Sequence, residues 1–250
     1  MDYTVDAVDK AIGLLLLVAQ FPDLGVTELA KRSGNTKARS FRLLGTLESN
    51  GLVKRDANAA YRLGHRVLYL GASATEQLDI VRLSGAVFKQ VHECCDENVF
   101  LRIRDGLETV CVAGMDSSHD VRLYVQIGAR RPLYLGASGK LLLAHAGSDV
   151  LEQVVAAGMT KYTENTLTSK RALEKELKTI LAAGFSVSFG ERNFDTVAVA
   201  APVRDSSGHV IAALSIAGPA SRINEKNLDV FINCVKQNAK SFSKELGYSE

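Results

Sequence analysis

Basic side chains with the spacing of a nucleic-acid contact occur in one short part of the sequence. The stretch from Asn35 to Arg55 reads NTKARSFRLLGTLESNGLVKR, and apart from Glu48 its charged residues are all positive. Residues 31–62 carry eight basic and two acidic side chains, a net charge of +6, whereas residues 1–30 sum to −4 and the whole chain to +2. Such a local excess of positive charge is typical of a surface that binds a polyanion.

Two further patterns could carry chemistry, and neither is complete. The run His92-Glu93-Cys94-Cys95 offers metal ligands, but structural zinc uses four ligands and we find no second cluster. We therefore interpret Cys94 and Cys95 as small buried residues near a helix end. GASGKL, from Gly136 to Leu141, lacks the glycine spacing and the Ser or Thr after Lys of a phosphate-binding loop. The five histidines have no nucleophile or paired carboxylate at a recognisable spacing, so the sequence predicts no catalytic residue, no metal site and no cofactor.

The beginning of the sequence contains no targeting or membrane signal. MDYTVDAVDK opens with acidic residues, and the apolar stretch Ile12 to Ala19 is far shorter than the roughly 20 residues that a membrane span needs. Four cysteines in 250 residues do not make a disulfide framework. We expect a soluble, reduced, cytoplasmic protein without a membrane partner.

Three helices and a hairpin are expected to position the basic residues. Apolar spacing predicts a helix over Val8–Gln20. Thr27 is expected to cap a short helix through Ser33 that Gly34 ends, and Asn35 a third helix to about Ser49 that Gly51 ends. Residues 52–63 then form a hairpin around a polar turn at 56–58. Together, residues 1–63 predict a winged helix-turn-helix domain.

Rotation of the third helix at 100° per residue separates an apolar side from a basic side. Leu43, Leu44 and Leu47 cluster together, with Phe41 at their edge, while Arg39, Arg42 and Thr46 lie opposite. Such a helix is suited to the major groove of double-stranded operator DNA, and a basic hairpin to the flanking phosphates. The predicted DNA-binding residues are Thr36, Lys37, Arg39, Ser40, Arg42 and Thr46 on the helix, and Lys54, Arg55 and Arg62 on the hairpin.

The rest of the chain alternates between helical and strand patterns. Residues 64–78 are expected to form a connecting helix, and residues 79–250 an α+β domain with helices on the faces of a sheet. The expected strands are 99–103, 108–112, 121–127, 185–188, 197–203 and 210–216. The expected helices are 80–95, 139–145, 150–156, 170–182 and 224–246.

Several sequence blocks resemble the isocitrate-lyase-regulator (IclR) family of bacterial transcription factors. They include VTELAKRSG, AYRLG, RPLYLGASGKLLLA, LEKELKTILAAGFSVSFGE and VAVAAPVRDSSGHVIAALSIAGPASRI, in family order over about residues 5–247. The resemblance implies a winged-helix domain joined by a helix to a GAF-like effector-binding domain. It also implies a homodimer or homotetramer that acts on operators near catabolic genes, more often as a repressor than as an activator. Ala38-Arg39 replaces the Ser-Thr pair usual in the family's recognition helix, which should alter the bases that are read.

The resemblance also implies a small-molecule effector site in the second domain. Its residues would be Ala137, Ser138 and Gly139, where a helix N-terminus suits a carboxylate, together with Ser188, Glu191, Ala198 and Ser215. Relatives that bind short oxo-acids commonly carry Asp and Cys at the positions of Ser188 and Ala198. The smaller or less polar residues here, with Asp195 in place of a usual Gly, favour an effector that is a larger or less acidic organic acid, an aromatic acid, an amide or a lactone.

Simpler interpretations of these residues stay open. Gly139 and Lys140 could serve only loop-to-helix packing, and Ser215 could bond a backbone carbonyl within the sheet. The basic helix could be a solvated face of a small-molecule enzyme, or the second domain an inert interaction module. The lack of a catalytic constellation argues against the enzyme.

Overall fold

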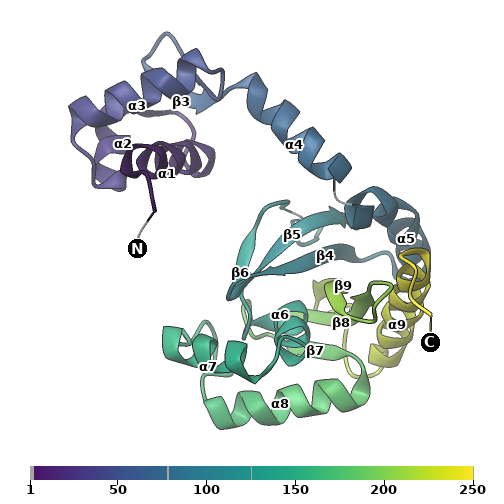
Figure 1. Cartoon of the computed structure of the whole chain (residues 1–250). Helices are drawn as coiled ribbons and strands as arrows, with labels where there is room; N and C mark the ends of the chain where they lie inside the picture. Colours follow the sequence, from purple (N-terminus) through teal and green to yellow (C-terminus); the bar gives the residue numbers. More distant parts are fainter. Residues whose placement is uncertain (1–2, 78, 125, 250) are drawn as a thin grey trace. The chain divides into compact units, whose positions relative to one another are not determined.

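The computed structural model describes residues 3–77, 79–124 and 126–249, and the chain divides into two compact units, Met1–Asp79 and Ile80–Glu250 (Figure 1). Each unit has its own hydrophobic core and is described separately below. The finer division that we predicted, into 1–63, 64–78 and 79–250, stays a prediction.

The first unit is a winged helix-turn-helix domain. Its helices pack around Leu14, Leu29 and Leu44, which are completely buried, and Tyr61 of the hairpin closes the core at 2% exposure. Two hairpin strands and a third short strand form an antiparallel sheet of order β1-β3-β2. The elements are α1 (Asp6–Gln20), β1 (Leu24–Gly25), α2 (Val26–Ser33), α3 (Lys37–Ser49), β2 (Val53–Arg55), β3 (Ala60–Leu63) and α4 (His65–Gln77).

Two of the predicted helix caps were wrong by one or two residues. α2 begins at Val26 rather than after Thr27, because Leu24 and Gly25 pair with β3 and the chain stays extended until Gly25. α3 is capped by Thr36 rather than Asn35, since the Thr36 hydroxyl accepts a hydrogen bond from the Arg39 amide at 3.3 Å. The stop at Gly34 is confirmed, because this residue has φ +66°.

A backbone junction joins the hairpin to α4. The Gly64 amide donates to the Leu52 carbonyl at 2.9 Å, and the Arg66 amide donates to the Gly51 carbonyl at 3.3 Å. A Cβ at position 64 would lie only 2.1 Å from the Gly51 carbonyl oxygen. The first turn of α4 is therefore fastened to the turn that follows α3, and only glycine permits this approach.

The second unit is built on an antiparallel sheet of order β6-β5-β4-β9-β8-β7. One face packs on α5 and α9, whose core includes Val87, Val91 and Phe242, and the other face packs on α6 and α8 (Figure 1). This arrangement confirms the predicted α+β class. The elements are α5 (Asp79–Cys95), β4 (Asn98–Asp105), β5 (Glu108–Met115), β6 (Arg130–Pro132), α6 (Gly136–Ala144), α7 (Ser148–Ala157), α8 (Lys170–Ala183), β7 (Ser186–Phe189), β8 (Thr196–Arg204), β9 (Val210–Pro219) and α9 (Leu228–Glu245).

The predicted strand at 121–127 was wrong. Residues 121–124 and 126–127 are irregular, and Val121 and Tyr124 are 74% and 80% exposed. The edge of β5 that this segment could have joined pairs instead with β6, where Thr109 lies opposite Arg131. Residue 125 lies outside the described residues. The last helix also starts later than predicted, at Leu228, because Asn224–Asn227 form a turn in which the Asn227 side chain accepts from the Asn224 amide.

Candidate DNA-binding and effector-binding sites

The predicted DNA-binding residues of α3 lie on two different sides of the helix. Arg42 and Thr46 are exposed, as predicted from their position opposite Leu44 and Leu47, and Lys37 is exposed in the first turn of the helix. The Thr46 hydroxyl donates to the Arg42 carbonyl at 3.1 Å, a bond within the helix that leaves the Arg42 guanidinium outside. Arg42 and Thr46 form the outward surface of α3.

Ser40 cannot belong to this surface, and its prediction was wrong. The residue is 0% exposed, and its hydroxyl has no hydrogen-bond partner among the described residues. Ser40 precedes Leu44 by four residues and Leu47 by seven, a spacing that places all three on the same side of a helix. The helical spacing that identified the leucines could therefore have identified Ser40 as a core position.

Arg39 is partly exposed and forms an ion pair with Asp6 of α1. This arginine holds the pKa of the Asp6 carboxyl below its usual value, mainly through the hydrogen bond between the two side chains. A phosphate or base that approached Arg39 would have to share the guanidinium with Asp6 or displace it. Sequence reasoning treated Arg39 as free and missed this acidic neighbour 33 positions away.

The hairpin carries its cations outward. Lys54 and Arg55 of β2 and Arg62 of β3 are all exposed. Arg62 forms an ion pair with Asp23, and Arg55 lies over the ring of Tyr61 at 5.9 Å from the centroid. Thr36 is also exposed, so eight of the nine predicted DNA-binding residues reach solvent at least in part. The winged domain thus presents an outward group of cations on α3 and the hairpin.

The predicted effector residues of α6 are packed tightly in its first turn. Ala137 and Ser138 are 2% and 8% exposed. A Cβ at Gly139 would lie 2.7 Å from the Leu133 carbonyl oxygen and 3.0 Å from that of Pro132. Close packing of the helix against the preceding loop therefore requires glycine here, which supports the simpler interpretation of this residue.

Glu191 occupies the N-terminus of α6 from within the chain. Its carboxylate accepts from the Gly136 amide at 2.9 Å and from the Lys140 ammonium at 2.5 Å. Lys140, only 3% exposed along its side chain, also donates to Glu176 at 2.7 Å and to the Val187 carbonyl at 2.9 Å. The partial positive charge at the start of α6 thus already faces an anion of the protein itself.

Three other predicted effector residues share one face of the sheet. Ser188 lies opposite Ala198, and Ser215 lies opposite Ala200, which follows Ala198 by two residues on β8. Ala200 belongs to the core beneath α6, so we name this surface the α6 face. The Ser215 hydroxyl donates to the Phe100 carbonyl at 3.4 Å, the backbone bond considered above as an alternative. The structure brings these residues together, and their contact with an effector stays a prediction.

Sequence reasoning missed two arginines on the same face. Arg102 of β4 is 3% exposed, and Arg131 of β6 has a buried Nε atom. A charged residue inside the apolar strand pattern VFLRI was the available signal, because a buried strand seldom carries arginine without a partner.

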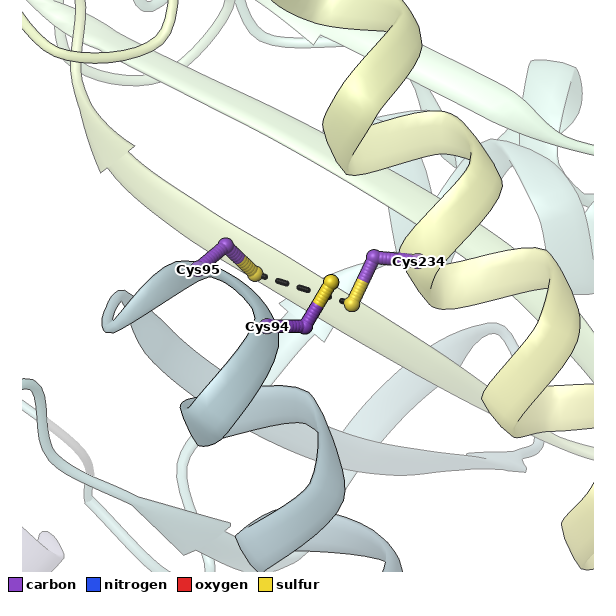
Figure 2. Close-up of side chains that lie close together, drawn as sticks. All are labelled: Cys94, Cys95 and Cys234. Atoms are coloured by element: carbon purple, nitrogen blue, oxygen red, sulfur yellow. Dashed lines mark hydrogen bonds between the residues drawn. The ribbon is translucent and has the colours of Figure 1, made fainter.

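A third group consists of the thiols of Cys94 and Cys95 on α5 and Cys234 on α9 (Figure 2), whose sulfur atoms lie within 4.8 Å of one another. The Cys95 thiol donates to the Cys234 sulfur at 3.7 Å. Cys94 is exposed, against our interpretation of it as buried. Burial of the sulfur atom nevertheless raises the pKa of Cys94 to about 11, which disfavours the thiolate that metals bind. The prediction that the chain holds no metal stays a prediction.

Comparison with known proteins agrees with this architecture. The sequence model described as the IclR helix-turn-helix domain matches residues 7–57, and that of the bacterial transcriptional regulator IclR C-terminal domain matches residues 72–244. The regulator KipR of Bacillus subtilis is 32% identical over 241 residues, 96% of each chain. KdgR of Escherichia coli is 30% identical over 249 residues, 99% of this chain and 95% of that protein. A solved IclR regulator from Alicyclobacillus acidocaldarius superposes with a TM-score of 0.88 at 27% identity, covering 98% of this chain and 100% of that chain.

The winged domain and the sheet domain together define a DNA-binding transcriptional regulator of the helix-turn-helix type. The chain belongs to the IclR family, whose members are transcriptional regulators rather than enzymes. Within the described residues, no helix is both long enough and apolar enough to cross a membrane.

Proposed function

We propose that this regulator represses a catabolic operon and that a small organic molecule bound in the second unit changes its affinity for operator DNA. The outward group of cations on a capped winged helix carries the proposal. Relatives named as transcriptional repressors support it, such as AllR of Escherichia coli, which is 28% identical over 210 residues. Because its partner is DNA, we place the protein in the cytoplasm.

The contacts proposed with DNA follow from the exposed side chains. Arg42 would read base edges in the major groove, where a bidentate contact with guanine contributes about 1–3 kcal/mol of discrimination. Lys37, Lys54 and Arg62 would contact phosphates, which position the protein without reading sequence. Ser40 takes no part, since it is buried.

An uncovered apolar stripe on α1 supports the proposal of a homodimer or a larger homo-oligomer. Val8, Ile12 and Leu16 are 55%, 52% and 65% exposed and follow one another at intervals of four residues, along one side of the helix. Exposed stripes of this kind are typical of surfaces that a second protein chain covers. A two-fold dimer would present two copies of α3 to two half-sites of an operator.

The effector acts only if it binds the DNA-competent and the DNA-incompetent arrangements with different affinities. We place its site on the α6 face, near Ser138, Ser188, Ala198 and Ser215. Glu191 is hydrogen-bonded to Lys140 and to the Gly136 amide, and Gly139 packs closely against the Leu133 carbonyl. We infer that these two residues support the site by holding α6 in place.

A gel-shift titration tests the proposal on the DNA upstream of the protein's own gene, at two salt concentrations, with and without candidate organic acids, aromatic acids, amides and lactones. Arg42→Ala should weaken operator binding about 5- to 150-fold. Arg171→Ala, which removes the same charge from an exposed position of α8, should leave binding unchanged.

Equal binding by the two variants would exclude α3 as the helix that reads DNA. A circular-dichroism spectrum like that of the wild type shows that Arg42→Ala has folded. Salt-insensitive binding, or none on any neighbouring intergenic DNA, would instead favour the interaction module considered above.

A further inference from the structure

Two arginines from different strands lie side by side on the α6 face. Arg102 of β4 pairs with Cys111 of β5, and Arg131 of β6 pairs with Thr109 of β5. Residues two apart on a strand share a face, and directly opposite residues share it as well. Arg102 and Arg131 therefore flank β5 on one surface. Arg102 also lies opposite Ala213, which packs in the core beneath α6.

Only some of the side-chain donors of these two arginines have hydrogen-bond partners in the described part of the chain. One terminal nitrogen of Arg102 donates to the Thr109 hydroxyl and to the Ala129 carbonyl, both at 3.2 Å. Thr109 in turn donates to the backbone carbonyl of Arg131 at 3.4 Å. The Nε atom of Arg131 is buried and has no partner in the part of the chain that the structure describes. An unpaired buried donor on a charged group is costly, so this atom indicates a missing acceptor.

The charges of this pair are not balanced by the protein. Burial, together with the positive charges of Arg102 and Arg192, lowers the pKa of Arg131 to about 9. Burial likewise lowers the pKa of Arg102, again with a contribution from Arg192. Arg192 is exposed on the loop after β7, next to Glu191. Among the described residues, no carboxylate is paired with any of the three arginines, although buried charges in proteins are normally paired.

The arginines adjoin the predicted effector residues. Phe100 precedes Arg102 by two residues and lies opposite Ser215, so Arg102 and Ser215 are diagonal neighbours on the α6 face. The surrounding side chains of this face include the small Ala198, Ala213 and Ala217 as well as Phe100. The helix N-terminus that a ligand carboxylate was expected to use is already held by Glu191.

We propose that Arg102 and Arg131, with Arg192 at the rim, form an anion-binding site for a small dianionic metabolite that serves as the effector. Carboxylates and phosphates can each accept two hydrogen bonds from the planar guanidinium, and two negative charges would balance those of the buried Arg102 and the partly buried Arg131. This inference rests on the proposed function. It places the negative charges of the effector at strands β4 and β6 rather than at the N-terminus of α6. It also replaces the expectation of a less acidic effector with that of a doubly charged one.

The experiment uses malonate, succinate, glutarate and inorganic phosphate as probes on the full-length protein, by isothermal titration calorimetry and thermal melting. Butyrate and succinamide serve as singly charged and uncharged comparisons. At least one dianion should bind and raise the melting temperature, and butyrate and succinamide should not. Binding by a dicarboxylate alone identifies a carboxylate ligand, and binding by phosphate alone identifies a phosphorylated one.

Arg102→Gln and Arg131→Gln should each weaken binding of that dianion about 30-fold or more, as loss of one partner of a buried charge pair does. Without ligand, both variants should melt at or above the wild-type temperature, because an unbalanced buried charge has been removed. Arg130→Gln is the matched control. Arg130 is exposed on β6 beside Arg131 and pairs with Asp105 and Glu108. The Arg130→Gln variant should therefore bind the dianion as tightly as the wild type does.

Three results would overturn the inference: no dianion binds, succinamide binds as tightly as succinate, or Arg130→Gln weakens binding as much as Arg131→Gln. The gel shift separates this failure from failure of the proposed function. A protein that binds operator DNA and responds only to uncharged effectors retains the function without the arginine site. A protein that binds a dianion through Arg131 but no DNA retains the site without the function.

Discussion

Replacement of Glu191 by alanine is expected to destabilise the second unit strongly. The substitution removes the carboxylate that joins Lys140 to the first turn of α6. The side chains of Lys140 and Glu191 are only 3% and 6% exposed, so water cannot take over the role of the lost partner.

The magnitude follows from what remains around Lys140. Breaking a buried ion pair by removing one partner costs about 3–5 kcal/mol. Glu176 stays 2.7 Å from the Lys140 ammonium and is itself 31% exposed, so we expect a loss of about 2–3 kcal/mol for the pair. The Gly136 amide loses its acceptor, which adds about 1 kcal/mol. The free energy of unfolding should therefore fall by about 3–4 kcal/mol.

Urea unfolding followed by far-ultraviolet circular dichroism measures this loss, with a double-mutant cycle to isolate the pair. Lys140→Met and Glu191→Gln should each destabilise, whereas the two combined should lie within about 1–2 kcal/mol of the wild type, because no buried charge is left unpaired. Glu164→Ala is the control. Glu164 pairs with Lys161 at 2.5 Å but is 86% exposed, and its loss should cost less than about 1 kcal/mol.

The reasoning fails if the free energy of unfolding of Glu191→Ala lies within about 1 kcal/mol of that of the wild type. It also fails if the loss of stability in the double variant equals the sum of the losses in Lys140→Met and Glu191→Gln. Either outcome would mean that the carboxylate is not a structural partner of Lys140. Glu191 would then again be a candidate for direct contact with the effector.

Three further substitutions probe the same structure. Ser40→Ala should leave operator affinity unchanged and raise the free energy of unfolding by up to about 1 kcal/mol, because it removes a buried unpaired hydroxyl. A gel shift and urea unfolding measure the two quantities, and loss of DNA binding would contradict the prediction. Gly139→Ala should lower the free energy of unfolding by about 1–3 kcal/mol, since its Cβ would meet the Leu133 carbonyl. Gly85→Ala, which adds a methyl group in open space on α5, should not lower it, and equal urea midpoints of the two variants would contradict the prediction. Burial keeps the pKa of His145 below its unfolded value of about 6.5, so the unfolded state takes up more protons and stability falls as the pH is lowered through that range. The difference between the melting temperatures at pH 7 and pH 5 should therefore be smaller for His145→Gln than for the wild type. An equal difference would exclude this histidine as a cause of the loss of stability at low pH.

Local signals were sufficient for most elements of the fold. The apolar spacing of α1 and α3, the glycine that ends α2 and the hairpin turn are all encoded within a few residues of where they act. The same is true of the exposed positions of Lys37, Arg42 and Thr46. Ser40 was misplaced because a polar residue among basic neighbours suggested a surface, although its spacing from Leu44 indicates the core.

Features that depend on distant parts of the chain could not be predicted in this way. Residues 121–127 alternate like a strand, but the edge they needed is taken by β6, whose sequence RRP has no strand pattern. The partner of Lys140 lies 51 residues away, and that of Arg39 lies 33 residues away. Only the folded chain shows that Glu191 fills the start of α6 and that Arg102 and Arg131 share a face.

The backbone junction at Gly64 has a mechanical consequence for the winged domain. Hydrogen bonds from Gly64 and Arg66 to the Leu52 and Gly51 carbonyls make α4 a stiff extension of the turn that follows α3. At 1.5 Å per residue, the 13 residues of α4 form an arm of about 20 Å. A sideways displacement of about 3 Å at the far end of such an arm corresponds to a tilt of about 10° at its base. A small movement at the end of α4 would therefore turn α3 by enough to carry Arg42 out of register with a base edge.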